Sequence, residues 1–243
     1  MNVKNILAIA LAASIPLQVT GYAAYAQSAT QVDPEFMSKL EAALEQRPEL
    51  VLMAAQRAQQ RAQEQQQAQM NEMAGNVRVE LAKADNPGYV IGNPQGSSTF
   101  IEFIDYRCGY CKRAHDEVET LVSQNPEARV VVVMRPILGP QSETLARFAM
   151  AAGEQGKFKQ AHDYLYTNTV EANDAGLQAA STALGLDWSK IKTDMTGPAV
   201  TKRLAENNRI GDELNVTGTP LFVTPTRVIP GATTAADLKA DLD

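Results

Sequence analysis

The chain contains two cysteines, Cys108 and Cys111, and their spacing is the clearest chemical signal in the sequence. They follow an apolar run that predicts a strand and stand at the start of a predicted helix. Cysteines three residues apart on a first helical turn form a strained, reducible disulfide, and the first thiolate faces free N–H groups at the positive end of the helix dipole. We therefore expect a depressed pKa for Cys108, which makes it the nucleophile, with Cys111 as the resolving thiol. Arg113 and His115 on the same helix either favour the thiolate or belong to a solvated helix face.

The two thiols also have alternative uses as metal ligands or as a structural disulfide. A structural zinc or iron–sulfur site needs about four ligands, and the sequence adds only the histidines His115 and His162 to the cysteine pair. An inert structural disulfide would close a loop too small to stabilise the chain much. Cu(I) binding by the two thiolates is an alternative, because thiolates suit this soft ion, whereas the thioether pair Met70 and Met73 is more typical of packing.

The segment before the cysteines predicts the element that positions them. Thr99 to Asp105 is a nearly continuous apolar strand, and we expect a helix from Cys108 to about Ser123. Glu102 is the one acid within that strand, and an unpaired carboxylate among apolar neighbours has a raised pKa. A buried Glu102 is then able to exchange protons with Cys111. The alternative is a solvent-facing position on the strand.

The residues after a turn cluster at Asp85-Asn86-Pro87-Gly88 alternate between strand and helix, which indicates an α/β fold. An all-helical insertion at about residues 141–214 separates the early strands from a final hairpin, and a short helix begins at about Thr234. We expect the helices of the insertion to break at Gly153, Gly156, Gly185 and Gly197-Pro198. The expected strands are Tyr89–Ile91, Thr99–Asp105, Val130–Met134, Leu221–Thr224 and Arg227–Ile229.

Residues 1–26 have the pattern of a secretory signal peptide. Lys4 precedes an apolar stretch from Ile6 to Leu17, and Ala24-Tyr25-Ala26 matches a cleavage site between small residues. The alternative is a membrane anchor, but the apolar run is shorter than the roughly 20 residues that span a bilayer. We expect cleavage after Ala26 and export to a compartment in which disulfides form and persist.

The segment 27–84 is rich in Ala, Gln, Glu and Arg and predicts two helices in front of a catalytic domain at 85–243. Asp33 and Pro34 suit the start of the first helix, and Pro48 the start of the second. The thin apolar stripes of these helices bury little surface, so the segment is either an exposed spacer or a surface for self-association. We favour a homo-oligomer formed through residues 33–84.

Composition excludes several classes of protein. Of the 243 residues, 44% are apolar and 21% are charged, which is typical of a globular protein rather than a disordered one. The formal net charge of −6 argues against binding to nucleic acid or to an anionic membrane surface.

The stretch Phe103-Ile-Asp-Tyr-Arg-Cys-Gly-Tyr-Cys-Lys112, with Gly218-Thr219-Pro220 downstream, resembles the DsbA-like branch of the thioredoxin-fold thiol:disulfide oxidoreductases. The resemblance covers about Pro87 to Asp243, including Pro136-Ile-Leu-Gly-Pro-Gln-Ser-Glu143, and implies a thioredoxin fold with a helical insertion. It implies that Pro220 is cis and that Thr219 presents its backbone to the substrate. An ordinary trans proline that opens a strand is the alternative. The resemblance also gives Glu102 the role of the family's buried acid.

Two departures within the motifs bear on the direction of the reaction. Gly109-Tyr110 differs from the Pro-His dipeptide of the strongest oxidase in the family, and these intervening residues tune the redox poise. Thr219 is similar to the residue that precedes the cis proline in disulfide isomerases. Together with the helical extension, these features resemble ScsC-like periplasmic proteins, which are associated with copper tolerance and some of which are oligomeric isomerases.

The resemblance therefore implies a periplasmic disulfide isomerase or reductase that acts on exported proteins with cysteines and needs no cofactor. It also implies a membrane redox partner, either DsbD- or ScsB-like or DsbB-like. The alternatives are a monomeric disulfide oxidase and a Cu(I)-binding protein that uses the same two cysteines.

Overall fold

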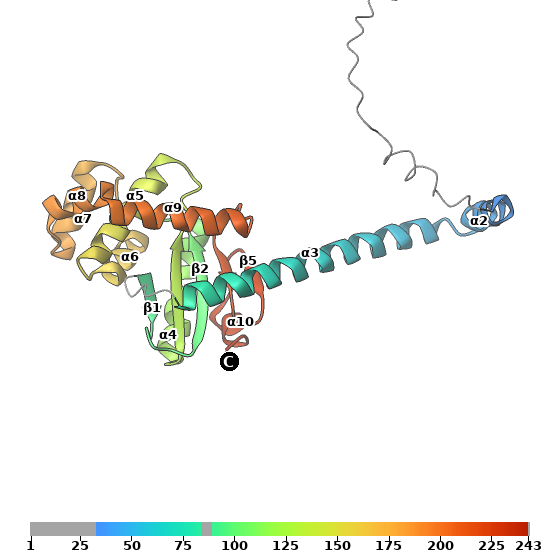
Figure 1. Cartoon of the computed structure of the whole chain (residues 1–243), viewed down its shortest axis with the longest axis horizontal. Coiled ribbons are helices and arrows are strands. Elements are labelled where there is room, and N and C mark those ends of the chain that lie inside the picture. The colour runs from blue at the N-terminus through green and yellow to red at the C-terminus, as the bar shows by residue number, and fades with distance from the viewer. Residues whose placement is uncertain (1–32, 84–88, 243) are drawn as a thin grey trace, which may run out of the picture. The chain divides into compact units, whose positions relative to one another are not determined.

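The computed structural model describes residues 33–83 and 89–242, so the expected signal peptide at 1–26 lies outside the described residues. The chain divides into two compact units, Met1–Gln60 and Arg61–Asp243. The boundary falls within one long helix, α3 (Glu49–Lys83), which is labelled in Figure 1. Among the described helices, none combines the length and apolarity that a membrane span requires.

The described part of the first unit consists of α2 (Pro34–Gln46) and the beginning of α3. The side chain of Asp33 accepts a hydrogen bond from the Glu35 N–H group at 3.0 Å, and Pro34 occupies the first helical position. This is the helix start that the sequence predicts, because an aspartate cap and a following proline both favour the first turn. Most of the large apolar side chains described in this unit are exposed: Phe36, Met37, Leu40, Leu50, Val51, Leu52 and Met53.

The second unit is built on a five-stranded sheet with the order β1-β3-β2-β4-β5. The two central strands, β2 (Ser98–Ile104) and β3 (Ala128–Met134), run parallel and are buried along their whole length. Parallel strands covered on both faces are continuous apolar runs, and the sequence predicted β2 from such a run. The other strands pair antiparallel: β1 (Val90–Gly92), β4 (Leu221–Val223) and β5 (Val228–Pro230). All five lie within two residues of their expected positions.

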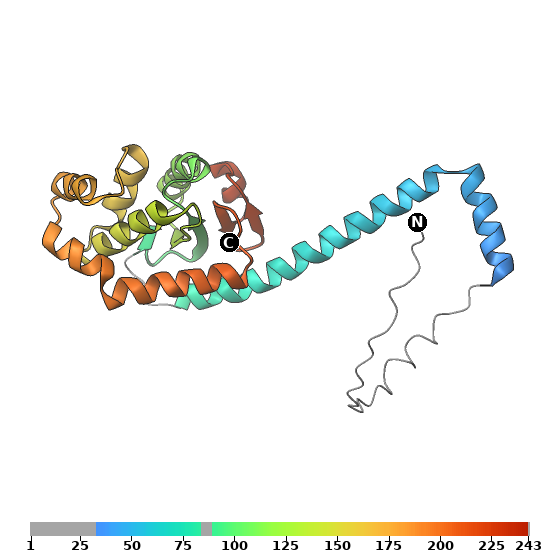
Figure 2. The same cartoon turned by 90° about the horizontal axis from the view of Figure 1, so that it is seen from above.

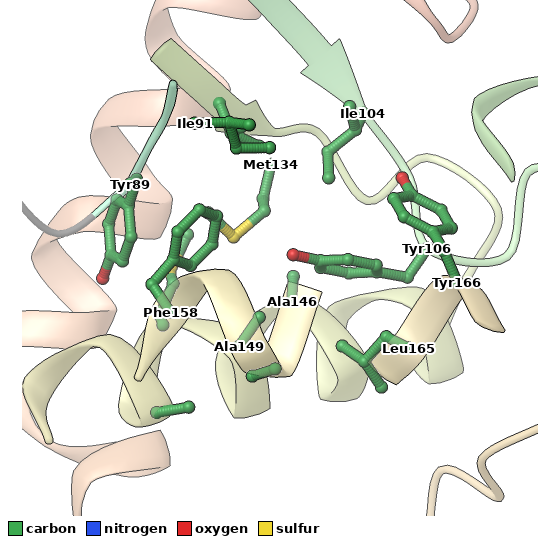
Figure 3. Packing of buried hydrophobic residues seen from close by; sticks show 14 of the residues in the cluster. Tyr89, Ile91, Ile104, Tyr106, Met134, Ala146, Ala149, Phe158, Leu165 and Tyr166 are labelled. Atoms are coloured by element: carbon green, nitrogen blue, oxygen red, sulfur yellow. The ribbon is translucent and has the colours of Figure 1, made fainter. Parts of the chain in front are cut away.

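Helices cover both faces of the sheet. Alternate residues of β2 and β3 contribute to two apolar clusters, because successive side chains of a strand point to opposite faces. The larger cluster joins the sheet to α4 (Gly109–Gln124), α10 (Ala235–Lys239) and the helical insertion. In Figure 3, Met134 and Ile104 from the strands lie above Ala146, Ala149 and Phe158 from the helices.

The insertion consists of α5 (Pro140–Glu154), α6 (Phe158–Thr167), α7 (Asp174–Leu184), α8 (Trp188–Thr196) and α9 (Pro198–Glu213). In Figure 2 the first four of these helices are grouped together, in yellow-green to orange. The expected breaks at Gly156 and Gly185 fall between helices, and Gly197-Pro198 marks the boundary between α8 and α9.

The expected break at Gly153 is wrong, because α5 continues through it to Glu154. A Cβ atom at this position would lie 2.8 Å from the ring of Tyr89. Glycine therefore serves close packing here rather than helix termination.

The second half of α3 packs against the chain's own sheet. Ala74, Val77 and Leu81 are buried in the smaller apolar cluster, together with strand residues and with Ile210 and Leu214 from the end of α9 and beyond. These residues belong to the segment 27–84, which was expected to be either an exposed spacer or, preferably, a surface for self-association. In the structure this part of the stripe already has a partner within the compact unit Arg61–Asp243.

Candidate active site

The two cysteines stand at the beginning of α4, directly after β2 and a short turn. Cys108 is the N-cap residue, with an extended backbone (φ −79°, ψ 116°), and Cys111 lies in the first helical turn. Both are free thiols; Cys108 is half-buried, whereas Cys111 is fully buried. No side-chain oxygen caps this helix, so the N–H groups of its first turn are directed toward the Cys108 sulfur.

The surroundings shift the pKa values of the two thiols in opposite directions. Burial alone would raise the pKa of Cys108. Hydrogen bonds from the backbone N–H groups of Cys111 and Tyr110 and with the Thr219 side chain outweigh burial, so the pKa lies below the ordinary cysteine value. Burial raises the pKa of Cys111, and the nearby Glu102 and Cys108 raise it further. The direction for Cys108 is the one that its place at the helix start predicts.

The loop before β4 brings Thr219 and Pro220 against the cysteines. The Thr219–Pro220 peptide bond is cis, and the carbonyl oxygen of Thr219 accepts a hydrogen bond from the Cys108 thiol at 3.2 Å. The contact joins residues 111 positions apart in the chain. The resemblance in the sequence implied this arrangement, and the trans alternative is wrong.

Glu102 lies in the middle of β2, paired with Val132 on β3 and Phe222 on β4. The side chain is 2% exposed, so the solvent-facing alternative is wrong. It shares the face of Phe100 and Ile104, on the side of the sheet that α4 covers. Burial raises the pKa of Glu102 to about 8, and this carboxyl group in turn raises the pKa of Cys111.

Asp105, which the sequence analysis did not single out, holds the turn between β2 and α4. Its Oδ1 atom accepts a hydrogen bond from the Arg107 N–H group at 2.8 Å. Its Oδ2 atom accepts from the N–H groups of Ile137 and Leu138 at 2.9 and 3.0 Å. An aspartate that follows a strand and begins a turn is a recognisable signal, but its second set of partners lies more than 30 residues away.

A cluster of aromatic and imidazole rings lies near Cys111, and the sequence did not predict it. The Tyr106 hydroxyl and the Nδ1 atom of His162 are 3.1 Å apart, and the rings of His115 and His162 have centroids 5.1 Å apart. Tyr166 packs on Tyr106 with a centroid distance of 5.1 Å, and both are labelled in Figure 3. Burial keeps the pKa of His162 well below its ordinary value, so this imidazole is neutral. His115 is 6% exposed and does not belong to a solvated helix face.

One group of potential metal ligands occurs among the described residues, but a lysine already occupies it. Ligand atoms of His115, Glu119 and Asp163 lie within 4.8 Å of one another. The Lys159 ammonium group lies 3.0 Å from Glu119 Oε1 and 2.6 Å from Asp163 Oδ2, so it supplies the positive charge between them. Cu(I) binding by Cys108 and Cys111 stays a prediction.

A groove of about 760 Å³ opens beside the cis proline. We call it the cis-proline groove. Its lining comes from the start of α4, the loops around β4 and β5, and one stretch of α3. The Arg113 guanidinium lies over the Tyr110 ring at 4.2 Å from its centroid, and both line the groove. The lining residues are Gln66, Gln67, Met70, Tyr110, Arg113, Asn215, Thr217, Gly218, Thr219, Pro220, Leu221, Pro230, Gly231 and Ala232.

The raised pKa of Glu102 predicts how stability depends on pH. Because the folded state holds this proton more tightly than the unfolded state, stability is highest below the unfolded value of 4.5 and falls as pH rises toward about 8. The loss is at most about 1.4 kcal/mol per pH unit in this window. Glu102→Gln should remove this slope in urea unfolding curves measured from pH 4 to 9. Glu171→Gln, at an exposed position, is the control. Equal slopes in both variants would contradict a buried protonated Glu102.

Comparison with known proteins agrees with this geometry. Residues 99–243 match the family model of the DSBA-like thioredoxin domain. A thioredoxin-like oxidoreductase from Silicibacter pomeroyi is 36% identical, with a TM-score of 0.60 over 65% of this chain and 95% of that one. BcfH from Salmonella enterica Typhimurium is 26% identical, with a TM-score of 0.70 over 90% of this chain and 97% of that one.

A lower sequence identity accompanies the same fold in ScsC. ScsC from Proteus mirabilis, in a transitional conformation, is 22% identical, with a TM-score of 0.61 over 90% of this chain and 95% of that one. Among curated proteins, the Na(+)/H(+) antiporter NhaA 1 of Salinispora arenicola is 30% identical over 136 residues, which are 55% of this chain. The chain spans about a fifth of the length of that relative (21%). The family match covers more than half of the chain, and the chain therefore belongs to the DSBA-like thioredoxin domain family and has the fold of its thiol-disulfide oxidoreductases.

Proposed function

We propose that this protein is a periplasmic disulfide isomerase and reductase, in which Cys108 attacks disulfides of exported proteins and Cys111 resolves the product. The observation that carries the proposal is the opposite shift of the two thiol pKa values. Cys108 is accessible and its pKa is lowered, whereas Cys111 is buried and its pKa is raised. A partly exposed thiolate beside a protonated reserve thiol is the arrangement that nucleophilic attack and later resolution require.

The chemistry balances without any cofactor. The Cys108 thiolate attacks one sulfur of a client disulfide, forms a mixed disulfide and releases the other client cysteine as a thiolate. If a different client thiolate then attacks the client sulfur, a new client disulfide forms and Cys108 leaves as a thiolate, so nothing is oxidised or reduced overall. If Cys111 attacks the Cys108 sulfur instead, the client leaves as a dithiol and the protein holds a Cys108–Cys111 disulfide, which a dithiol reductant must reduce.

Glu102 supplies the base for the resolving step. Cys111 must lose its proton before it attacks, and burial disfavours a free thiolate at that position. Because burial raises the pKa of Glu102 to about 8, this carboxyl group exchanges a proton readily near neutral pH. We assign it the role of accepting the Cys111 proton during reduction and returning it when the dithiol form is restored.

The exposed apolar residues of the first unit support self-association. Phe36, Met37 and Leu40 lie on one side of α2 and are 57%, 39% and 38% exposed. Large apolar side chains gathered in one exposed patch mark a contact surface. The structural similarity to BcfH covers 90% of this chain, which is more than the unit Arg61–Asp243 makes up, so it includes part of the first unit. Several active sites on one oligomer raise the effective concentration of thiolate at a misfolded client, which favours isomerisation.

The isomerase direction also requires that the Cys108–Cys111 pair is kept reduced. We assign this task to a membrane dithiol partner of the DsbD or ScsB kind on the periplasmic side, where the expected signal peptide would deliver the chain. A DsbB-like oxidant would instead maintain the disulfide and make the protein a monomeric oxidase.

The test is reactivation of a scrambled, multi-disulfide protein by the reduced mature chain. We expect the double variant Phe36→Ser/Leu40→Ser to lose both the oligomer, as measured by light scattering, and most of the reactivation, because its active sites are separated. Reduction of a small disulfide should be unchanged. Glu41→Gln/Glu45→Gln, at exposed polar positions of the same helix, is the matched control.

Two other results would decide against the proposal. A double variant that remains oligomeric, or that reactivates the scrambled protein as well as the parent chain does, would remove the role of the extension. A reduced protein that fails to reactivate the client, while its oxidised form oxidises a reduced client, would identify a disulfide oxidase.

A further inference from the structure

One side of the cis-proline groove is formed by α3, which lies outside the matched domain at 99–243. Gln66, Gln67 and Met70 line the groove from this helix, and all three belong to the compact unit Arg61–Asp243. Met70 is also partly buried against the smaller apolar cluster, which fixes the position of the helix beside the sheet. The helix that precedes the thioredoxin domain in sequence thus lines the same groove as Thr219 and Pro220, and the Thr219 carbonyl contacts the Cys108 thiol.

Side chains of α3 also occupy the free edge of the sheet. β5 is the last strand, and it pairs with β4 on one side only. On its other side, the Val228 N–H group donates to Asn71 Oδ1 at 3.1 Å, and the Val228 carbonyl accepts from Gln67 Nε2 at 3.5 Å. Pro230, at the end of the strand, has no N–H group to offer. An extended client therefore does not add to this edge as a further strand, which is the usual use of an open sheet edge.

The chemistry of the groove fits a polypeptide segment rather than a single charged group. The α3 wall offers two amides, which both donate and accept hydrogen bonds, and a flexible thioether. The part of the lining that comes from α4 offers the Tyr110 ring and the Arg113 guanidinium stacked on it, and Arg113 is the one charged side chain in the described lining. Thr219 also lines the groove, and its carbonyl oxygen is 3.2 Å from the Cys108 sulfur.

We propose that Gln66, Gln67 and Met70 form the second wall of the client site and select its occupant, an extended cysteine-containing segment with neutral or acidic flanking residues. The inference rests on the proposed function. The client cysteine faces Cys108, and the flanking residues run along Thr219 between the Tyr110–Arg113 pair and α3. Neutral amides tolerate many side chains, whereas the Arg113 charge favours acidic residues over basic ones.

Gln66 is the residue at which this inference is tested most cleanly. It is exposed, and it takes no part in the hydrogen bonds that hold α3 to Val228. Gln65 is the matched control, because it is exposed on the same helix, points about 100° away around the axis and does not line the groove. The full chain with Gln66→Glu is compared with the full chain with Gln65→Glu, so both variants carry the same change in charge.

The reduced proteins react with three disulfides: a small aromatic disulfide, a peptide disulfide flanked by aspartates and one flanked by lysines. For Gln66→Glu we expect the ratio of the aspartate rate constant to the lysine rate constant to fall about threefold or more. The change should fade at high salt. Gln65→Glu should stay near the parent ratio, and the rate constant for the small disulfide is used to normalise the peptide rate constants of each protein.

A second substitution tests the shape of the wall. Gln66→Trp places a bulky ring in the groove and should slow both peptides about tenfold relative to the small disulfide, whereas Gln65→Trp should leave this relative rate near that of the parent chain. Equal behaviour of the position 66 and position 65 variants would overturn the inference and leave the proposed function standing. A parent chain that reacts with none of the disulfides would overturn the proposed function, and the client site with it.

Discussion

Replacement of Cys108 by serine is expected to abolish thiol-disulfide exchange, whereas Cys111→Ser is expected to leave the first attack intact. The loss for Cys108→Ser should be on the order of a thousandfold or more, because the serine hydroxyl is not ionised at neutral pH and the remaining Cys111 is fully buried with a raised pKa. In Cys111→Ser the N–H groups at the start of α4 still stabilise the Cys108 thiolate. That variant should therefore form the mixed disulfide but fail to resolve it.

Mass spectrometry after mixing each reduced variant with a disulfide peptide distinguishes the two cases. Cys111→Ser should accumulate a covalent adduct at Cys108, and Cys108→Ser should accumulate none. The rate of adduct formation should follow a pKa below the ordinary cysteine value, as the Cys108 surroundings require. Adducts on both variants at similar rates would show that the two thiols are equivalent and would contradict the assigned roles.

The sequence was sufficient to predict the parts of the site that lie in local motifs. Cys108, Cys111 and Glu102 sit on one strand, one turn and one helix start, so their relation follows from strand and helix periodicity. The meeting of Thr219 with Cys108 spans 111 positions, and it was expected from the family resemblance rather than from any physical rule. Strand positions were predictable because buried parallel strands are continuous apolar runs.

Other parts of the site depend on tertiary contacts that leave no local signal. Tyr106, His162 and Tyr166 come together only when α6 packs beside the turn after β2. A single tyrosine or histidine in the sequence does not indicate which residues it will contact. The second carboxylate oxygen of Asp105 binds backbone groups of the loop after β3. These partners are visible only once the insertion has folded onto the sheet.

The role of α3 shows the same limit most clearly. The apolar residues Val77 and Leu81 have the helical spacing of a contact stripe, and that spacing is identical whether the partner is another copy or the chain's own sheet. The buried strand residues Ile101 and Val131 needed cover on their second face. The end of α3 supplies that cover, whereas the large apolar side chains at its beginning, from Leu50 to Met53, are exposed.

Removal of the end of α3 is therefore expected to destabilise the catalytic unit. A shortened chain that begins at Arg61 should keep the stability of the compact unit, whereas one that begins at Asp85 loses Val77 and Leu81 from the sheet. Each buried side chain of this size contributes about 1.5–3 kcal/mol, so the free energy of unfolding should fall by several kcal/mol between the two. Urea unfolding followed by far-ultraviolet circular dichroism measures the difference.

Single substitutions in the full chain test the same point without truncation. Leu81→Ala should cost about 2–5 kcal/mol, because the side chain is 4% exposed and leaves a cavity against the sheet. Val79→Ala, two residues away on the same helix and 48% exposed, should change stability by no more than about 0.5 kcal/mol. Equal stability of the chains that begin at Arg61 and Asp85, together with a small cost for Leu81→Ala, would mean that the end of α3 is only a spacer. The cis-proline groove would then have one wall instead of two.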